Sequence, residues 1–334
     1  MKAIALLSGG LDSTLAARVV MEQGVELEAL NLMTVFCTCT HRGATCLASQ
    51  KAVETLGLPL KVLNVSEEYL CVVKGPKHGY GRNMNPCIDC RIFMLKKAKA
   101  RMEESGAAFI VTGEVLGQRP MSQRKDAMQL IEKEAGLEGF VLRPLSAKVL
   151  PATVPEKEGW VDREKLLAVQ GRTRKPQMAL AEHYGIHDYP CPAGGCLLTD
   201  PGFAKRMKDL MTHDSNFSLN DVHLLKMGRH FRFSPGVKLV VGRNEEENQK
   251  IQTFAQQEDI LFKVSNLPGP LSLLRGRPDE EDIERAAAIA AYYSKGKDLR
   301  KVEVTYKRIG EDNYQSLLIP PILTGEVHRL MINE

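Results

Sequence analysis

The sequence predicts an α/β fold, a doubly wound parallel sheet with helices on both faces, followed by a C-terminal α+β domain. Three observations lead to this prediction. Short apolar runs alternate with helical patterns over about the first 150 residues, a glycine-rich turn follows the first apolar run, and the alternation ends near residue 201. Because parallel strands need a crossover between them, strands that alternate with helices are typical of a parallel sheet.

The first part of the chain is expected to contain strands and helices in turn. The expected strands are 2–7, 26–33, 60–65 and 108–111, and the expected helices are 12–23, 47–57 and 89–104. Ligands of such folds bind at the carboxyl ends of the strands. Residues 8–10 and 112–114 each follow a predicted strand, so we expect both at one ligand-binding edge of the sheet.

The second part has a different pattern and is expected to form its own domain. Two helices are followed by strands near 230–233, 237–241 and 260–264, a helix at 279–294 and a strand at 301–306. The predicted organisation is therefore a first domain over 1–170, a basic and cysteine-containing connection over 171–200, and an α+β domain over 201–334.

Composition and charge narrow the class of protein. The chain has 334 residues, 43% of them hydrophobic and 26% charged, which is typical of a soluble globular protein. We find no export signal and no apolar stretch near the about 20 residues that a membrane span needs, so we expect a cytoplasmic protein without a membrane partner. The net charge of +4 permits an anionic partner without requiring one. Eight cysteines in a cytoplasmic protein favour metal, cluster or redox chemistry over disulfides.

The turn after the first strand has the residue types that a phosphate group requires. It consists of Leu7, Ser8, Gly9, Gly10, Leu11, Asp12 and Ser13. Two glycines let backbone N–H groups approach an anion, and the helix that starts near Asp12 directs its N-terminal N–H groups at the same place. The two serines add hydroxyl donors, and Asp12 suits a contact to magnesium. The absence of Gly-x-x-x-x-Gly-Lys argues against an ordinary P-loop kinase or GTPase.

This turn resembles the signature of the PP-loop, or adenine nucleotide α-hydrolase-like, superfamily. Its members cleave ATP between the α and β phosphates and adenylate a substrate. The resemblance implies that residues 7–13 bind ATP and Mg²⁺, with Asp12 as a catalytic residue.

A second segment resembles the corresponding stretch of the 4-thiouridine synthetases. It runs from Thr112, Gly113 and Glu114 to Gly117 and Gln118, with Ser122 and Gln123 just beyond and Arg143, Pro144 and Leu145 at the next strand end. The resemblance implies that Thr112, Gly113 and Gln118 also belong to the ATP site. The two glycines would keep the backbone open beside the nucleotide.

Cys87 and Cys90 open the predicted helix 89–104 in an Asn-Pro-Cys-x-x-Cys segment. This spacing puts two thiols within reach of one metal or cluster, and the helix N-terminus is expected to lower their pKa. Similar segments occur in PP-loop tRNA thiolases, in which this pair and one distant cysteine hold a 4Fe–4S cluster. The resemblance implies Cys196 as the third ligand, with Cys191 as the alternative.

Other interpretations of the cysteines stay open. Four thiolates, Cys87, Cys90, Cys191 and Cys196, would also suit a zinc ion, and the pair would also suit a metal-free persulfide–disulfide relay. A further group comprises Cys37, Cys39, His41 and Cys46. We interpret that group mainly as small buried residues near the nucleotide. Cys71 is interpreted as a core residue.

Two basic regions are expected to contact RNA. The first comprises Arg172, Arg174 and Lys175, a basic turn at a helix start, which suggests an anionic partner because cations are unfavourable there. The second part of the chain resembles the small domain of NFACT-R type, which is proposed to bind RNA. Its candidate phosphate contacts are Lys226, Arg232 and Arg243.

Together these patterns predict a tRNA sulfurtransferase. A uridine carbonyl would be adenylated by ATP, and sulfur held at Cys87, Cys90 and Cys196 would then displace AMP. The chain starts at the strand of the glycine turn and has neither the N-terminal RNA-binding domains nor the rhodanese domain of known 4-thiouridine synthetases. We therefore expect RNA binding by the C-terminal domain or a separate subunit, and an external sulfide or persulfide donor. The alternatives are an ATP pyrophosphatase such as an amidating ligase acting on a small molecule, and an RNA-binding protein with a non-catalytic nucleotide site.

Overall fold

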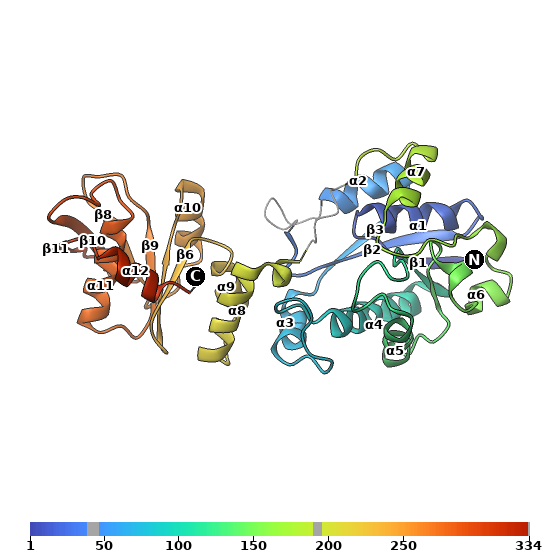
Figure 1. The fold of residues 1–334 in the computed structure, drawn as a ribbon, viewed down its shortest axis with the longest axis horizontal. Helices are drawn as coiled ribbons and strands as arrows, with labels where there is room; N and C mark the ends of the chain where they lie inside the picture. The colour runs from blue at the N-terminus through green and yellow to red at the C-terminus, as the bar shows by residue number, and fades with distance from the viewer. Residues whose placement is uncertain (39–46, 190–195, 333–334) are drawn as a thin grey trace. The chain divides into compact units, whose positions relative to one another are not determined.

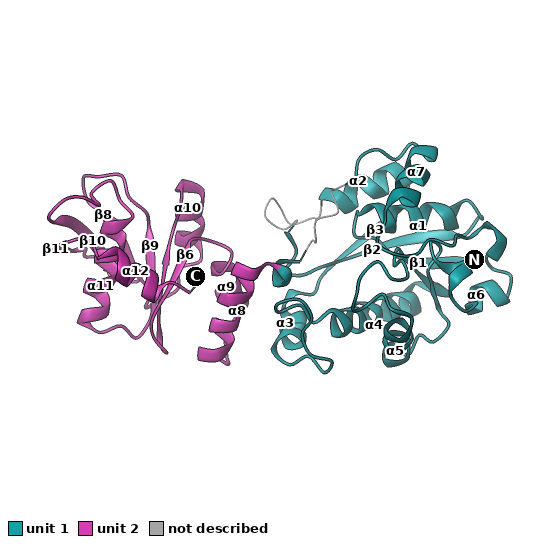
Figure 2. Ribbon diagram, viewed as in Figure 1, with its two compact units in different colours: residues 1–199 teal, residues 200–334 magenta. Residues whose placement is uncertain are grey.

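The structure is a computed structural model that describes residues 1–38, 47–189 and 196–332. The chain divides into two compact units, residues 1–199 and 200–334 (Figure 2). Each unit has its own sheet and its own apolar core. Among the described residues, no helix combines the length and the apolar character that crossing a membrane requires.

Unit 1 contains a five-stranded parallel sheet. Its strands are β1 (Lys2–Leu6), β2 (Glu26–Met33), β3 (Leu60–Asn64), β4 (Phe109–Thr112) and β5 (Val141–Leu142), in the order β3-β2-β1-β4-β5. The central strands are buried on both faces, which explains why they read as continuous apolar runs in the sequence. The predicted parallel sheet is confirmed.

Helices cover both faces of this sheet (Figure 1). One face packs against α1 (Leu11–Met21), α2 (Leu47–Leu56) and α7 (Lys175–His183), and the other packs against α4 (Cys87–Ser105) and α5 (Lys125–Ala135). The helix α3 (Ser66–Lys74) packs beside α4, and the short α6 (Val154–Lys157) precedes α7. Within β1, Ala3 faces the first layer and Ile4 the second, as the two-residue period of a strand requires. The sheet is therefore doubly wound.

Unit 2 contains a six-stranded antiparallel sheet with helices. Its strands are β6 (Arg229–Ser234), β7 (Val237–Val241), β8 (Ile260–Val264), β9 (Ser272–Gly276), β10 (Val302–Arg308) and β11 (Gln315–Ile319), in the order β11-β10-β8-β9-β7-β6. Its helices are α8 (Pro201–His213), α9 (Leu219–Leu224), α10 (Glu245–Thr253), α11 (Glu280–Tyr292) and α12 (Thr324–Leu330). The predicted C-terminal α+β domain is confirmed.

The two faces of this sheet have different coverings. On one face, Phe231, Leu239 and Leu274 pack against α11. On the other face, Val240 and Leu273 pack against residues of α9 and α10. The second face also carries three cations side by side, because Arg232 pairs with Lys238 and Lys238 with Arg275 in neighbouring strands. Like charges in such positions repel, so this row depends on acidic partners.

Candidate functional site

The glycine turn between β1 and α1 has a backbone that only glycine accommodates. Gly9 has a φ of +76°, and a Cβ added there would lie 2.2 Å from the carbonyl carbon of Ala48 at the start of α2. Any side chain would therefore push the turn away from α2. The turn leads directly into α1, whose N-cap Gly10 makes no side-chain cap. The first N–H groups of α1 thus lack a capping side chain, as in an anion-binding helix start.

Polar side chains predicted for phosphate and magnesium gather at this helix start. The hydroxyls of Ser8 and Ser13 lie 3.2 Å apart, and Ser13 also donates to the Gly10 carbonyl at 2.9 Å. Asp12 Oδ2 accepts a hydrogen bond from Gln118 Nε2 at 3.0 Å, whereas the buried Oδ1 has no hydrogen-bond partner among the described residues. A buried carboxylate oxygen left without a donor fits a cation contact. The residues present therefore fit ATP with magnesium.

The segment after β4 packs directly onto the start of α1. A Cβ at Gly113 would lie 2.4 Å from the backbone nitrogen of Ser13, so the backbone there is too close to the start of α1 for any side chain. Five residues later, Gln118 forms its hydrogen bond to Asp12. The predicted site residues Thr112, Gly113 and Gln118 therefore do lie at the glycine turn.

Glu114, in the same segment, is the centre of a buried ion network. Its side chain is 4% exposed, and its Oε2 accepts a hydrogen bond from Arg143 Nε at 3.0 Å. Its Oε1 forms an ion pair with Arg91 Nε at 3.4 Å, outside hydrogen-bond geometry. Arg143 also pairs with Glu132 of α5. Burial would raise the pKa of Glu114, but Arg143 and Arg91 outweigh it and hold the pKa below its ordinary value.

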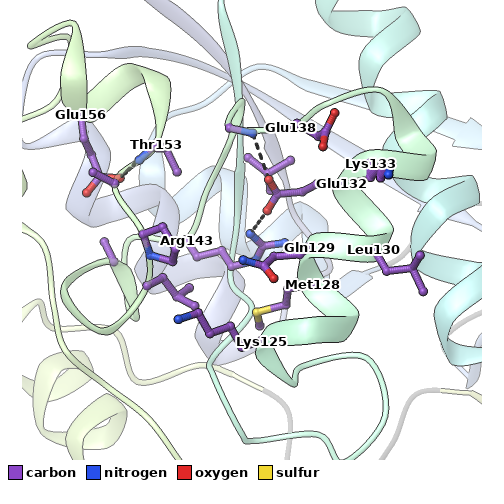
Figure 3. A pocket seen from close by; sticks show the side chains of 16 residues that line it. Lys125, Met128, Gln129, Leu130, Glu132, Lys133, Glu138, Arg143, Thr153 and Glu156 are labelled. Atoms are coloured by element: carbon purple, nitrogen blue, oxygen red, sulfur yellow. Dashed lines mark hydrogen bonds and ion pairs between the residues drawn. The ribbon is translucent and has the colours of Figure 1, made fainter.

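A cavity of about 440 Å³ lies beside this network (Figure 3). It is lined by α5 and by parts of the segment 138–156, and Arg143 contributes to its wall. The Nη2 atom of Arg143 is buried and has no hydrogen-bond partner among the described residues. Neither the glycine turn nor the cysteines line this cavity, so it is distinct from the predicted nucleotide site.

The cysteines predicted to act together are brought together, and Cys37 joins them. Cys87 is the first residue of α4 and Cys90 follows one turn later. Cys196 lies opposite Cys37 in an isolated antiparallel bridge. Cys37, Cys87 and Cys90 each raise the pKa of the Cys196 thiol electrostatically, so the four side chains lie in one region, hereafter the cysteine group.

The pKa values in this group are the reverse of what the helix start predicts. Burial raises the pKa of Cys87 and Cys90, and it raises that of Cys196 to about 12. Arg119 and Arg91 lower the pKa of Cys87 without offsetting burial, and a hydrogen bond from Tyr69 does the same for Cys90. The predicted lowering by the helix N-terminus was wrong, because the thiols lie in a partly apolar interior where a charge is costly.

The chemistry of the four thiols suits a metal site, whereas their positions in the structure do not form one. Four thiols in a partly buried setting are the donor set of an iron–sulfur or zinc site. Within the described ranges, however, no three histidine, cysteine or acidic side chains stand ready to coordinate one ion. The alternative ligand Cys191 and the residues Cys39, His41 and Cys46 lie outside those ranges. The thiols fit a cluster chemically, and binding one would require them to close up.

One segment contacts both the glycine turn and the helix that begins with Cys87. Gly113 packs on Ser13, and Gln118 contacts Asp12. The neighbour of Gln118, Arg119, acts electrostatically on Cys87. The neighbour of Cys90, Arg91, pairs with Glu114. The segment 112–119 therefore connects the glycine turn to the start of α4.

The predicted basic turn lies against the same segment. The N–H of Gly171 donates to the Leu116 carbonyl at 2.7 Å, and Leu116 forms a bridge with Gln170. Arg172, Arg174 and Lys175 follow directly, up to the start of α7. The three cations therefore follow directly after Gly171, whose backbone is hydrogen-bonded to Leu116 of the segment 112–119.

The predicted phosphate contacts of unit 2 are dispersed. Arg232 forms two hydrogen bonds to the carboxylate of Asp209 in α8, at 2.6 and 3.2 Å. Arg243 pairs with Glu247, and Lys226 follows α9. The charge of Arg232 is therefore already balanced by an acid within the unit.

A more exposed basic and aromatic group lies at the end of α11, and the sequence analysis missed it. Lys297 Nζ lies 4.5 Å from the ring centre of Tyr292, and the Arg229 guanidinium lies 4.4 Å from that of Tyr293. Four exposed cations follow the helix: Lys295, Lys297, Arg300 and Lys301. The available signal was two tyrosines followed by Ser-Lys-Gly-Lys-Asp-Leu-Arg-Lys. Rings interleaved with cations are typical of a nucleic-acid surface.

Two parts of the chain each match the model of a known family. Residues 1–148 match the family described as thiamine biosynthesis protein (ThiI), and residues 228–331 match the NFACT protein RNA binding domain. The "Rqc2 homolog RqcH" of Bacillus subtilis is 37% identical over 81 residues, covering 24% of this chain and 14% of that protein. The "Probable tRNA sulfurtransferase" of Geobacillus kaustophilus is 30% identical over 146 residues, covering 43% of this chain and 34% of that protein.

A solved structure of the U34-tRNA thiolase NcsA from Methanococcus maripaludis with its [4Fe-4S] cluster is 20% identical, covering 68% of this chain and 71% of that one. Its TM-score of 0.35 is too low to support a conclusion. The chain spans 14% and 34% of the lengths of the two relatives above. Residues 1–148 are thus similar to the ThiI family, and residues 228–331 are similar to the NFACT RNA-binding domain.

Proposed function

We propose that this chain is an ATP-dependent tRNA sulfurtransferase that adenylates a uridine carbonyl and then exchanges its oxygen for sulfur. The observation that carries the proposal is the segment 112–119, which contacts the glycine turn and, through the ion pair of Glu114 with Arg91, the start of α4, where Cys87 and Cys90 lie. The match of residues 1–148 to the ThiI family supports it, as does the similarity to a probable tRNA sulfurtransferase.

The activation step uses the glycine turn. Ser8, Ser13 and the first N–H groups of α1 would bind the phosphates, and Asp12 would hold Mg²⁺ with its unpaired Oδ1. The uridine carbonyl oxygen attacks the α-phosphorus and pyrophosphate leaves, so the base becomes an adenylate. The carbonyl oxygen, by itself a poor leaving group, can then leave the base as part of AMP. The residues named here position and stabilise charge, and they form no bond to the substrate.

The sulfur step uses the cysteine group. Cys87, Cys90 and Cys196, with Cys191 as the alternative third ligand, would hold a 4Fe–4S cluster. When bound, such a cluster supplies an iron atom at which sulfide can be presented. Because burial keeps the pKa of these thiols high, they stay protonated until metal binding or oxidation removes the protons. Sulfide then displaces AMP from the activated carbon.

The tRNA would contact both units. The basic turn of Arg172, Arg174 and Lys175 is continuous in sequence with the backbone contact between Gly171 and Leu116, so it suits a phosphate near the reacting base. The group around Tyr292 and Tyr293 in unit 2 suits stacking and phosphate contact, and it belongs to the part that matches an RNA-binding family. A tRNA substrate agrees with the cytoplasmic location predicted from the sequence.

The reaction itself gives the first test. We expect the purified protein to release AMP and pyrophosphate from ATP only when tRNA is added, and to form a thiolated uridine when sulfide is also present. Chromatography of nucleotides and mass spectrometry of tRNA nucleosides measure the two products, in vitro and in cells with and without the gene. Stimulation by glutamine or ammonia in place of tRNA would instead support an amidating ligase.

A substitution at Gly113 tests the close approach of the two backbones. We expect Gly113→Ala to weaken ATP binding by about tenfold or more, because a Cβ there displaces the first turn of α1. Equilibrium dialysis with labelled ATP measures the affinity, and circular dichroism checks that the variant is folded. Gly75→Ala is the matched control, since its added Cβ meets nothing within 4 Å. Equal ATP affinity of all three proteins contradicts the assigned nucleotide site.

Removal of one thiol tests the cluster. Protein reconstituted with iron and sulfide under anaerobic conditions should be brown, and Cys87→Ala should lose most of its iron and acid-labile sulfide. Cys71 is exposed, which corrects its interpretation as a core residue, and Cys71→Ala should keep both. Because adenylation does not need the thiols, Cys87→Ala should still release pyrophosphate. A colourless protein with one tightly bound zinc ion would decide for the zinc alternative.

Salt dependence tests the RNA surface of unit 2. The double variant Lys297→Gln, Arg300→Gln should bind tRNA more weakly, and the slope of log K against log[salt] should fall by about 0.7 to 0.9 for each phosphate that the variant no longer neutralises. Filter binding at several salt concentrations gives the slope. Lys263→Gln removes an exposed charge from β8 and is the control. An unchanged slope in the double variant excludes this surface.

A further inference from the structure

Cys37 and Cys196 face each other across two short extended segments. The bridge between them is antiparallel, and the N–H of Leu197 donates to the Phe36 carbonyl at 2.9 Å. A hydrogen bond between the residue before one cysteine and the residue after the other makes Cys37 and Cys196 a non-hydrogen-bonded pair. In such pairs the Cα atoms are about 4.5 Å apart and the side chains leave the strands on the same side.

This separation is compatible with a disulfide. Disulfides join residues whose Cα atoms are about 4.4 to 6.8 Å apart, with Cβ atoms about 3.8 Å apart. Both cysteines are in the thiol form, and neither residue is fully buried. Thr34 holds the Cys37 sulfur in place, with its N–H and its hydroxyl at 3.4 and 3.5 Å.

Cys196 also lies in the region of Cys87 and Cys90, both of which raise the pKa of its thiol electrostatically. It therefore stands between two alternative partners. Cys37 lies across a backbone bridge, whereas the Cys87–Cys90 pair lies at the start of α4. A sulfur that is bonded to Cys37 cannot bind a metal held by Cys87 and Cys90.

We propose that Cys37 and Cys196 form a reversible disulfide that removes Cys196 from the cysteine group. The reaction breaks two S–H bonds and forms one S–S bond, and two electrons and two protons pass to a two-electron thiol oxidant. With diamide, the N=N bond is reduced to a hydrazine. A dithiol reverses the step by exchange and becomes a cyclic disulfide itself. The consequence for cluster loading rests on the proposed function, whereas the disulfide itself does not.

The first experiment maps the bond in the full-length apoprotein. Diamide is added, remaining thiols are alkylated, and a non-reducing tryptic digest is analysed by tandem mass spectrometry. We expect a linked pair of peptides whose fragment ions assign the bond to Cys37 and Cys196, and whose link disappears with dithiothreitol. Fragment assignment is needed because the two peptides also contain Cys39 and Cys191. A Cys196 that is alkylated, or one joined to Cys87 or Cys90, overturns the proposal.

The second experiment measures the effect on metal loading. Oxidised wild-type protein should take up several-fold less iron and sulfide than reduced protein, and dithiothreitol should restore the uptake. Cys37→Ser keeps the size of the side chain and should load equally before and after diamide. If the linked peptide forms but oxidised wild-type protein loads fully, the regulatory role is wrong. If reduced protein loads no iron at all, the cluster of the proposed function fails, and the peptide map still decides the disulfide.

Discussion

The contact between Gly113 and the start of α1 is the constraint on which the site depends. Two backbones meet where a Cβ would lie 2.4 Å from the Ser13 nitrogen, so neither can move without the other. The other contacts of the segment 112–119 follow from that anchor. Glu114 forms ion pairs with Arg143 and Arg91, and Gln118 donates a hydrogen bond to Asp12. The glycine turn and the start of α4 are therefore both connected to the segment 112–119, and together the three form one frame.

The burial of Glu114 explains why this frame needs two arginines. A buried carboxylate without partners costs several kcal/mol, and removing one partner from a buried pair typically costs about 3 to 5 kcal/mol. Arg143 is itself 5% exposed and shared with Glu132, so each charge in the network is balanced by a neighbour. Arg91 extends the network to the residue beside Cys90. The same ion pairs that make burial tolerable also fix the position of the start of α4.

The sequence predicted the elements that have a strong local pattern. Continuous apolar runs gave β1 and β4, because strands buried on both faces have few polar positions. The strand β2 was also predicted, although Glu28 and Asn31 are buried within it. The strands β9 and β11 were not predicted. Three of the five side chains of β11 are exposed, and its place depends on pairing with β10. The helices α3, α5 and α10 were also missed.

The site residues were also predicted where a local motif marks them and missed where tertiary contacts decide. The glycine turn and the Cys-x-x-Cys pair are local motifs, and they were found from their spacing. The place of Cys37 depends on a bridge to a residue far along the chain, which no local pattern contains. The charge balance of Arg232 depends on Asp209 in another element, and so its availability to phosphate was not predictable from the strand alone. The direction of the cysteine pKa shift failed for a related reason, because a helix start is local and burial is tertiary.

The burial that raises the pKa of these thiols also suits the chemistry proposed for them. An adenylated base reacts with water as well as with sulfide, so the sulfur must arrive where water is scarce. A setting that is dry enough to protect the adenylate is also unfavourable to a free thiolate, which keeps the sulfur atoms protonated until a metal or an oxidant removes the protons. Arg91 and Arg119 moderate this cost without cancelling it. Burial thus accounts for the high pKa values of these thiols, and the ion pair of Glu114 with Arg91 connects the segment after β4 to the start of α4, where two of them lie.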